Sequence, residues 1–385
     1  MLNIVKYFAF FFLINNLIYC LPGFYQIAEF IFLALMSSSL VFILFSSKIL
    51  KEVILNKSFF LFFLLNLINL VYYVLIEFGD IESFKYLSAR FIQFSIFSIS
   101  IFIIREEFPI KFISFLKYLT VGSLILSIVF NFPNLESRYM GIFFNPNEFS
   151  IVMVVGFALV LFTGQKSFLN YFLLLLFLFV IILSGSRSAI VGLLIALSIY
   201  LFHYRTKNII SILFILIGTI IFSSFGGENN AIQRMFDVDL FLNRKYEYLY
   251  ALDTFLQKPI FGHGLKNYAY IDFSLIQFDD VQIDFGAHNG YLSILVQYGF
   301  IFSILFFSTL IYYLNKVWRK KNDFFGEDVM RTNFFIFILI YTLVNGMFEN
   351  TLIGINFFQS NLFWITLSYL LFYIYNKNES NSISD

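Results

Sequence analysis

Long apolar runs separated by short polar segments dominate the chain. A helix needs about 17–25 apolar residues to cross a hydrocarbon core about 30 Å thick, and the sequence offers about twelve such runs. Their approximate bounds are 5–21, 27–46, 58–77, 86–104, 110–130, 149–164, 168–184, 187–203, 208–224, 289–315, 332–349 and 357–375. The pattern predicts an all-α polytopic membrane protein with about twelve transmembrane helices, in which residues 1–385 form a single membrane domain.

One polar segment, residues 225–288, is long enough to hold structure outside the bilayer. Within it, residues 241–258 are predicted to form an amphipathic helix that ends before Pro259. The apolar stripe of this helix is expected to consist of Leu242, Tyr246, Leu249, Tyr250 and Leu256.

Lysine and arginine are distributed unevenly between the two sides of the predicted bundle. With both termini inside, sixteen of the 25 basic residues fall in cytoplasmic segments and nine fall outside. Five of those nine lie in 225–288, where charge has little influence on orientation because the loop is long. The distribution therefore predicts that 225–288 is a large extracytoplasmic, periplasmic loop.

Composition supports a membrane protein and excludes several other classes. Hydrophobic residues make up 60% of the chain and charged residues 13%, against about 25% charged in soluble domains. The net charge of +1 argues against nucleic acid as a partner. The single cysteine, Cys20, excludes an internal disulfide, and neither a metal-ligand spacing nor a nucleotide fingerprint is present. We therefore expect no cofactor and no metal.

Four segments on the predicted outer side carry the candidate chemistry, and the first contains Arg138. It continues through Asn145, Pro146 and Asn147, which predict the capped start of a helix. Arg138 together with backbone amides at a helix start is suited to bind an anion. The alternative is an ordinary helix start with an arginine nearby.

The second segment is the turn Ser184–Ser188, which contains Arg187. Ser188, Gly192 and Ala196 follow at four-residue spacing, a pattern that lets membrane helices approach closely. A guanidinium in so short an apolar hairpin is suited to a phosphate partner. The alternative is that Arg187 only fixes the orientation of the hairpin.

The third and fourth segments supply further basic groups. Arg244 and Lys245 begin the loop helix, where they are either a solvated face or a binding site for a lipid pyrophosphate. His288 lies where a predicted span begins on the outer side of the membrane, whereas His203 and His263 do not. An imidazole suits proton abstraction near neutral pH, although a lone histidine is more often structural than catalytic.

These segments, in this order, resemble those of the O-antigen ligase and O-antigen polymerase superfamily of bacterial surface polysaccharide enzymes. The resemblance covers about 138–299 and rests on four stretches: Gly141–Glu148, Ser184–Ser188, Pro259–Gly264, and His288–Tyr291 with Gln297–Gly299. It implies a GT-C-like, metal-independent glycosyltransferase that uses a glycan on undecaprenyl pyrophosphate as donor. By the resemblance, Arg138, Arg187 and Arg244 would hold the pyrophosphate and His288 would activate the acceptor hydroxyl, with Arg187 counted beside His288 as catalytic. Lys245, Asn147 and Asn289 complete the expected substrate-binding set.

The resemblance leaves the acceptor open. A polymerase passes the growing chain to a lipid-linked repeat unit, whereas a ligase passes it to lipid A–core. The abundance of phenylalanine, 58 residues, favours the polymerase by family analogy. A lipid-linked oligosaccharide transporter is a third alternative. The expected location is the bacterial inner membrane with the active site on the periplasmic side, and the expected partners are lipid-linked glycan, the bilayer and a chain-length regulator.

Overall fold

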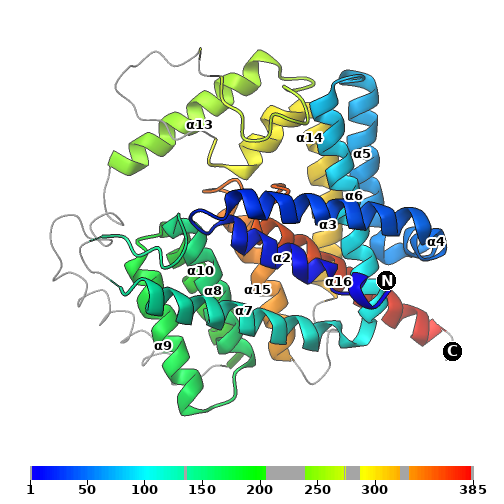
Figure 1. Ribbon diagram of the computed structural model, residues 1–385. Helices are drawn as coiled ribbons and strands as arrows, with labels where there is room; N and C mark the ends of the chain where they lie inside the picture. The colour runs from blue at the N-terminus through cyan, green and yellow to red at the C-terminus, as the bar shows by residue number, and fades with distance from the viewer. Residues whose placement is uncertain are drawn as a thin grey trace.

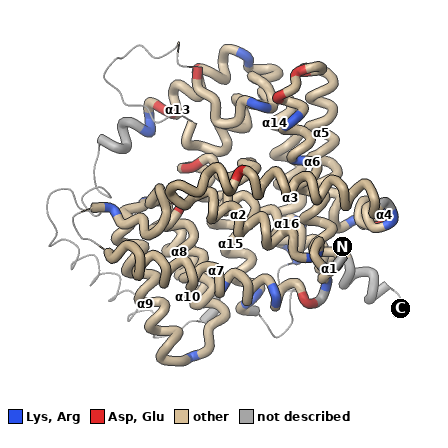
Figure 2. Tube along the Cα trace, in the orientation of Figure 1, with Lys and Arg blue, Asp and Glu red and all other residues tan. Residues whose placement is uncertain are grey.

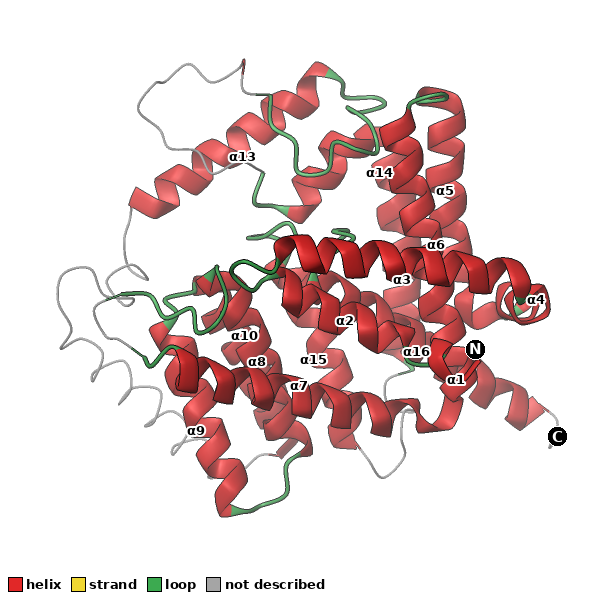
Figure 3. Ribbon diagram, viewed as in Figure 1, coloured by secondary structure: helices red, strands yellow, loops and turns green. Residues whose placement is uncertain are grey.

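The computed structural model describes residues 2–133, 137–204, 239–272, 274, 287–320 and 329–382, and these residues form helices and loops without a β-strand (Figure 3). The first half contains α1 (Leu2–Val5), α2 (Phe8–Tyr19), α3 (Tyr25–Phe45), α4 (Ser47–Leu55), the 3-10 turn η1 (Lys57–Phe59), α5 (Phe60–Ile76), α6 (Ile81–Ile104), the turn η2 (Arg105–Glu107) and α7 (Phe108–Phe130). The second half contains α8 (Pro146–Thr163), α9 (Phe168–Leu183), α10 (Arg187–Tyr204), α13 (Asp239–Gln257), α14 (Gly290–Arg319), α15 (Val329–Asn345) and α16 (Phe358–Ser382).

Helices occupy the predicted membrane spans wherever the structure describes them (Figure 1). The predicted ninth span, 208–224, and much of the 225–288 loop lie outside the described residues. Six helical stretches in the described part are long and apolar enough to cross a membrane, and shorter apolar helices accompany them. The chain is therefore an all-helical polytopic membrane protein, while the total of twelve spans and the GT-C likeness stay predictions.

Charged residues collect at helix ends and in connecting segments, as Figure 2 shows. The short helix α4 was not predicted, and it carries exposed Lys48 and Lys51 on one side while Val53 is buried on the other. Such an amphipathic helix is suited to the membrane interface. It lies in a segment that the charge distribution assigns to the cytoplasmic side.

The helix α8 forms the centre of one half of the bundle and packs against α7, α9, α10 and α15. The predicted stripe of small residues on α10 is confirmed, because Ser188 and Ala196 are buried and Gly192 lies against Tyr341 of α15. A Cβ at Gly192 would lie 2.5 Å from the Tyr341 ring. The absence of a side chain is thus what lets α10 approach α15 this closely.

The helix α14 is interrupted at Gly299, whose φ of 67° and ψ of −174° are not helical. Residues that follow α13 dock at this break through main-chain hydrogen bonds. The N–H of His263 donates to the Val296 carbonyl at 2.8 Å, and the N–H of Gly264 donates to the Gln297 carbonyl at 3.0 Å. Gly262 has a φ of 71°, and a Cβ there would lie 2.4 Å from the Gly299 nitrogen. The Pro259–Gly264 and Gln297–Gly299 stretches therefore form one joint between the loop and the bundle.

The predicted loop helix is confirmed as α13, but its predicted inner face is wrong. Of the predicted stripe, Tyr250 is buried, whereas Tyr246, Leu249 and Leu256 are exposed, and Leu242 lies outside the described side chains. The buried face instead consists of Glu247, Tyr250, Ala251 and Thr254. Small and polar residues face inward because α13 packs closely on α14 and hydrogen-bonds to neighbouring main chain. A prediction from hydrophobicity alone therefore selected a different face.

The connection between α15 and α16 is irregular and is held by buried side chains. Arg90 of α6, only 2% exposed, donates to the carbonyl of Ile353. The indole N–H of Trp364 donates to the Leu352 carbonyl at 3.1 Å, and the N–H of Gly290 donates to the Gly346 carbonyl at 2.7 Å. Buried non-helical backbone needs hydrogen-bond partners from the protein, and these contacts supply some of them.

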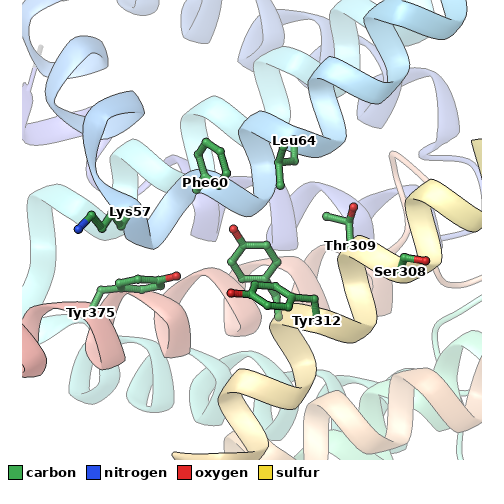
Figure 4. Close-up of a pocket in the computed structure, with 8 residues that line it drawn as sticks. Lys57, Phe60, Leu64, Ser308, Thr309, Tyr312 and Tyr375 are labelled. Carbon is green, nitrogen blue, oxygen red and sulfur yellow. The ribbon is translucent and has the colours of Figure 1, made fainter.

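A cavity of about 580 Å³ lies between α5, α14 and α16 and is lined by aromatic and hydroxyl side chains (Figure 4). Its lining includes Lys57, Ser308, Tyr312 and Tyr375. Its α14 residues, such as Ser308, lie beyond the break at Gly299, whereas Gly290 lies before that break. The cavity is therefore separate from the cluster at the start of α14 described next.

Candidate functional site

Arg138 joins the first two predicted segments. Its Nε donates to the carbonyl of Ser184 at 2.8 Å, and its Nη2 donates to Oδ1 of Asn147 at 2.7 Å. The N–H of Tyr139 also donates to the carbonyl of Leu183 at 2.8 Å. The segment before α8 is thus fixed to the turn before α10.

The start of α8 follows the predicted capping pattern. Asn145 is the N-cap, with extended backbone, and its Oδ1 accepts from the N–H of Asn147 at 2.8 Å. Pro146 occupies the first turn, where its missing N–H costs no hydrogen bond. Because Asn145 provides the cap, the amide side chain of Asn147 remains available to bridge other groups.

The carboxylate of Glu349 is the common partner of three predicted site residues. Asn147 Nδ2 donates to Glu349 Oε1 at 3.1 Å, and Arg244 Nη2 lies 3.6 Å from the same oxygen. His288 Nδ1 lies 3.3 Å from Glu349 Oε2. Segments separated by up to two hundred residues therefore meet at this one side chain, which we call the Glu349 cluster: Arg138, Asn147, Arg244, His288 and Glu349.

Sequence reasoning missed Glu349, although a signal was present. It ends the predicted span 332–349 and is the only charged residue between that span and the next. Charges at span ends on the outer side were the criterion for choosing the four segments, but the criterion was applied to basic residues. Applied to carboxylates as well, it would have selected Glu349.

The paired basic residues of α13 have different surroundings. Arg244 Nη1 donates to Glu247 Oε2 at 2.9 Å, in addition to its contact with Glu349. Lys245 is exposed, and no hydrogen bond or ion pair joins it to the cluster within the described residues. Tyr248 fixes α13 to the cluster by donating from its hydroxyl to the Met347 carbonyl at 2.6 Å, and burial raises the pKa of Tyr248.

His288 directly precedes α14 and has a left-handed φ of 35°. Asn289 caps the helix, with its Oδ1 accepting from the N–H groups of Tyr291 and Leu292 at 3.0 Å each. Its own N–H donates to Asn350 Oδ1 at 3.1 Å. The structure therefore gives Asn289 a capping role, which sets the position of the neighbouring imidazole.

Arg187 is the first residue of α10 and is half-buried. It follows Ser184, whose carbonyl accepts from Arg138, by three residues. Ser186 and Ser188 on either side of it are buried, with their hydroxyl oxygens 3.2 Å apart. The turn thus places Arg187 beside the Arg138 segment.

The cluster combines groups that bind anions with a group that can take a proton. Guanidinium groups present forked donors that match phosphate oxygens. A carboxylate at Nδ1 of a histidine favours the tautomer whose Nε2 carries the lone pair. Binding an anion and accepting a proton from a neighbouring hydroxyl are therefore both within the chemistry of this arrangement.

Taken together, the fold and the cluster define a polytopic membrane protein in which arginine, histidine and carboxylate side chains meet at helix ends. Residues 172–307 match the family model described as O-Antigen ligase, so the chain carries a domain of the O-antigen ligase and polymerase superfamily. This confirms the resemblance seen in the sequence. The family is associated with glycosyltransferase or ligase-type activity. No curated protein matches the chain.

The matched range contains three of the four motif stretches and leaves out Gly141–Glu148. The structure connects that remaining stretch to the matched part through the hydrogen bond of Arg138 to Ser184. Asn147 of that stretch and His288 of the matched range both contact Glu349, which follows the matched range.

Proposed function

We propose that the protein is a bacterial O-antigen or related surface-polysaccharide polymerase of the inner membrane. It transfers a glycan from undecaprenyl pyrophosphate to a lipid-linked repeat unit on the periplasmic side. The observation that carries the proposal is the Glu349 cluster, in which hydrogen bonds and an ion pair join two arginines and a histidine within a chain of this superfamily.

The proposed reaction exchanges one glycosidic linkage for another. The acceptor hydroxyl gives its proton to His288, and its oxygen attacks the anomeric carbon of the donor glycan. The bond between that carbon and the pyrophosphate oxygen breaks, and its electron pair leaves with the pyrophosphate. Arg138, Arg187 and Arg244 stabilise the leaving charge, a task that clustered guanidinium groups perform without a metal ion.

A surface-polysaccharide gel of a deletion strain tests this proposal. The strain is complemented with wild type, Arg187→Ala, His288→Ala or the control Lys85→Ala, an exposed residue whose described ion pair is with Glu82. For a polymerase, the deletion shows core with one repeat unit. Wild type and the control restore the ladder, whereas the two site variants do not, although immunoblots show equal amounts in the membrane.

The same gel distinguishes the alternatives. The description of the matching family favours a ligase as the second candidate, and a ligase deletion leaves bare core while polymer accumulates on the lipid carrier. If the His288→Ala variant restores the complete ladder, the proposed mechanism is wrong. Elongation by purified protein without a membrane gradient contradicts a transporter.

A further inference from the structure

We propose that Glu349 is a positioning residue that orients His288 for proton transfer and that holds Arg244 in place until the pyrophosphate replaces it. This inference rests on the proposed function. It assigns separate tasks to the two oxygens of one carboxylate, and each task has its own measurable consequence.

The first task belongs to Oε2, which lies 3.3 Å from His288 Nδ1. Acceptance of the Nδ1 proton by Glu349 places the lone pair of the ring on Nε2. When Nε2 takes the acceptor proton, the carboxylate stabilises the imidazolium that forms. The carboxylate keeps its own charge throughout, so the proton ends on His288 and the pyrophosphate carries the leaving electrons.

The second task belongs to Oε1, which accepts from Asn147 Nδ2 at 3.1 Å and lies 3.6 Å from Arg244 Nη2. These donors are suited to phosphate oxygens. The carboxylate therefore occupies a position that a phosphate oxygen is suited to take. Because like charges repel, an arriving pyrophosphate must displace Oε1 from Arg244, so the carboxylate weakens donor binding.

The backbone holds Glu349 and His288 in a fixed relation. Glu349 donates from its N–H to the Asn345 carbonyl at 2.9 Å, at the end of α15. The next residue, Asn350, accepts from the N–H of Asn289 at 3.1 Å and from the Ser293 hydroxyl at 2.7 Å. The residues that follow His288 and Glu349 are thus bonded to each other, which sets the distance between the two side chains.

Besides Glu247, which pairs with Arg244, Glu148 is a carboxylate close to the cluster, and its surroundings differ. Its Oε2 lies 4.0 Å from Sγ of Cys20, on α8 beside Asn147. Glu349, by contrast, contacts the imidazole directly. The geometry therefore assigns the positioning role to Glu349.

The test uses the purified full chain in detergent with two probes. The substrate is the lipid-linked repeat unit purified from the deletion strain, and undecaprenyl pyrophosphate alone is the binding probe. In Glu349→Gln, the side chain keeps its size and loses its charge. We expect kcat to fall by about 10-fold to 10⁴-fold, the range found when the carboxylate behind a functional histidine is neutralised. The Kd of undecaprenyl pyrophosphate is expected to stay equal or to tighten.

Two control variants separate the two tasks. Glu247→Gln removes the other carboxylate on Arg244, so it is expected to change donor affinity while kcat falls by less than about threefold. Glu82→Gln makes the same chemical change at an exposed position at the outer end of α6 and is expected to leave all parameters unchanged. Glu349→Asp restores the charge and is expected to recover more kcat than Glu349→Gln.

A double variant decides whether Glu349 acts through His288. If it does, His288→Ala with Glu349→Gln has the same kcat as His288→Ala alone, because the carboxylate has no histidine left to orient. A Glu349→Gln kcat within threefold of wild type overturns the inference, as does a loss of undecaprenyl pyrophosphate binding equal to the loss of kcat. Wild-type activity in His288→Ala instead overturns the proposed function, so the two failures are distinguishable.

Discussion

Replacement of Gly262 by alanine is expected to release the segment after α13 from the break in α14. Gly262 has a φ of 71°, and the added Cβ would lie 2.4 Å from the Gly299 nitrogen and 2.5 Å from the Gln297 carbonyl oxygen. Both are main-chain atoms, so rotation of a side chain cannot relieve the overlap. The segment must move, and the hydrogen bonds from the N–H groups of His263 and Gly264 are lost.

The magnitude follows from two contributions. The left-handed conformation costs an L-residue about 1–2 kcal/mol. Two lost main-chain hydrogen bonds cost about 0.5–1.5 kcal/mol each. The sum is about 2–5 kcal/mol. It lowers the equilibrium constant for docking of the segment on α14 by about 30-fold to 4,000-fold, since each 1.4 kcal/mol is a factor of ten.

Hydrogen exchange measured by mass spectrometry on the detergent-solubilised protein tests this value. We expect peptides that contain the amides of His263 and Gly264 to lose protection by that factor. Gly23→Ala is the matched control, because Gly23, in the turn between α2 and α3, has a φ of 78° and nothing lies within 4 Å of the added Cβ. It introduces the same kind of strain elsewhere, so protection at 263 and 264 should not change.

One outcome would refute the reasoning. If Gly262→Ala keeps the exchange of these amides within about threefold of wild type, the close main-chain contact with Gly299 does not hold the loop. An equal loss of protection in Gly23→Ala would show instead that general destabilisation causes the effect.

Three further predictions concern packing, a buried cation and pH. Gly192→Val introduces methyl groups against the α15 aromatic ring and is expected to destabilise the fold by about 1–3 kcal/mol, measured as a lower midpoint of thermal unfolding in detergent. Arg90→Met leaves a buried loop carbonyl without its donor and is expected to cost about 2 kcal/mol in the same assay, and an unchanged midpoint would contradict the role given to Arg90. Ser83 and then Lys266 hold the pKa of Asp80 at about 2. Because this value lies below the unfolded value of about 3.9, the contribution of the Asp80–Lys266 ion pair to the attachment of the loop is complete above about pH 4 and is lost as the pH falls towards 2. Pepsin cleavage near Lys266 should rise over that window, and Asp80→Asn should remove the pH dependence.

The sequence predicted those features that depend on local pattern. Apolar runs located the long apolar helices, Asn145 and Pro146 predicted the start of α8, and the spacing of Ser188, Gly192 and Ala196 predicted close helix contact. Each of these depends on residues within a few turns of one another. They could therefore be recognised without knowing the tertiary structure.

The candidate site was only partly predictable because its central contacts are not local. Glu349 is 61 residues from His288 and 202 residues from Asn147 in sequence, and no pattern along the chain indicates that they meet. The prediction of which face of α13 is buried was wrong for a related reason. Its buried residues, such as Ala251 and Thr254, are chosen by the close approach of α14 and by hydrogen bonds, neither of which hydrophobicity reports.

The joint at the break in α14 has a consequence for how freely the outer loop can vary in sequence. Main-chain atoms make several of its hydrogen bonds, and Gly262 and Gly299 must have no side chain. Side chains such as Tyr72 and Lys266 hold the rest of the segment. Loop residues outside these contacts can therefore be replaced without loosening the attachment of the loop to the bundle. The surface of the loop can change in this way while α13 keeps its place against α14.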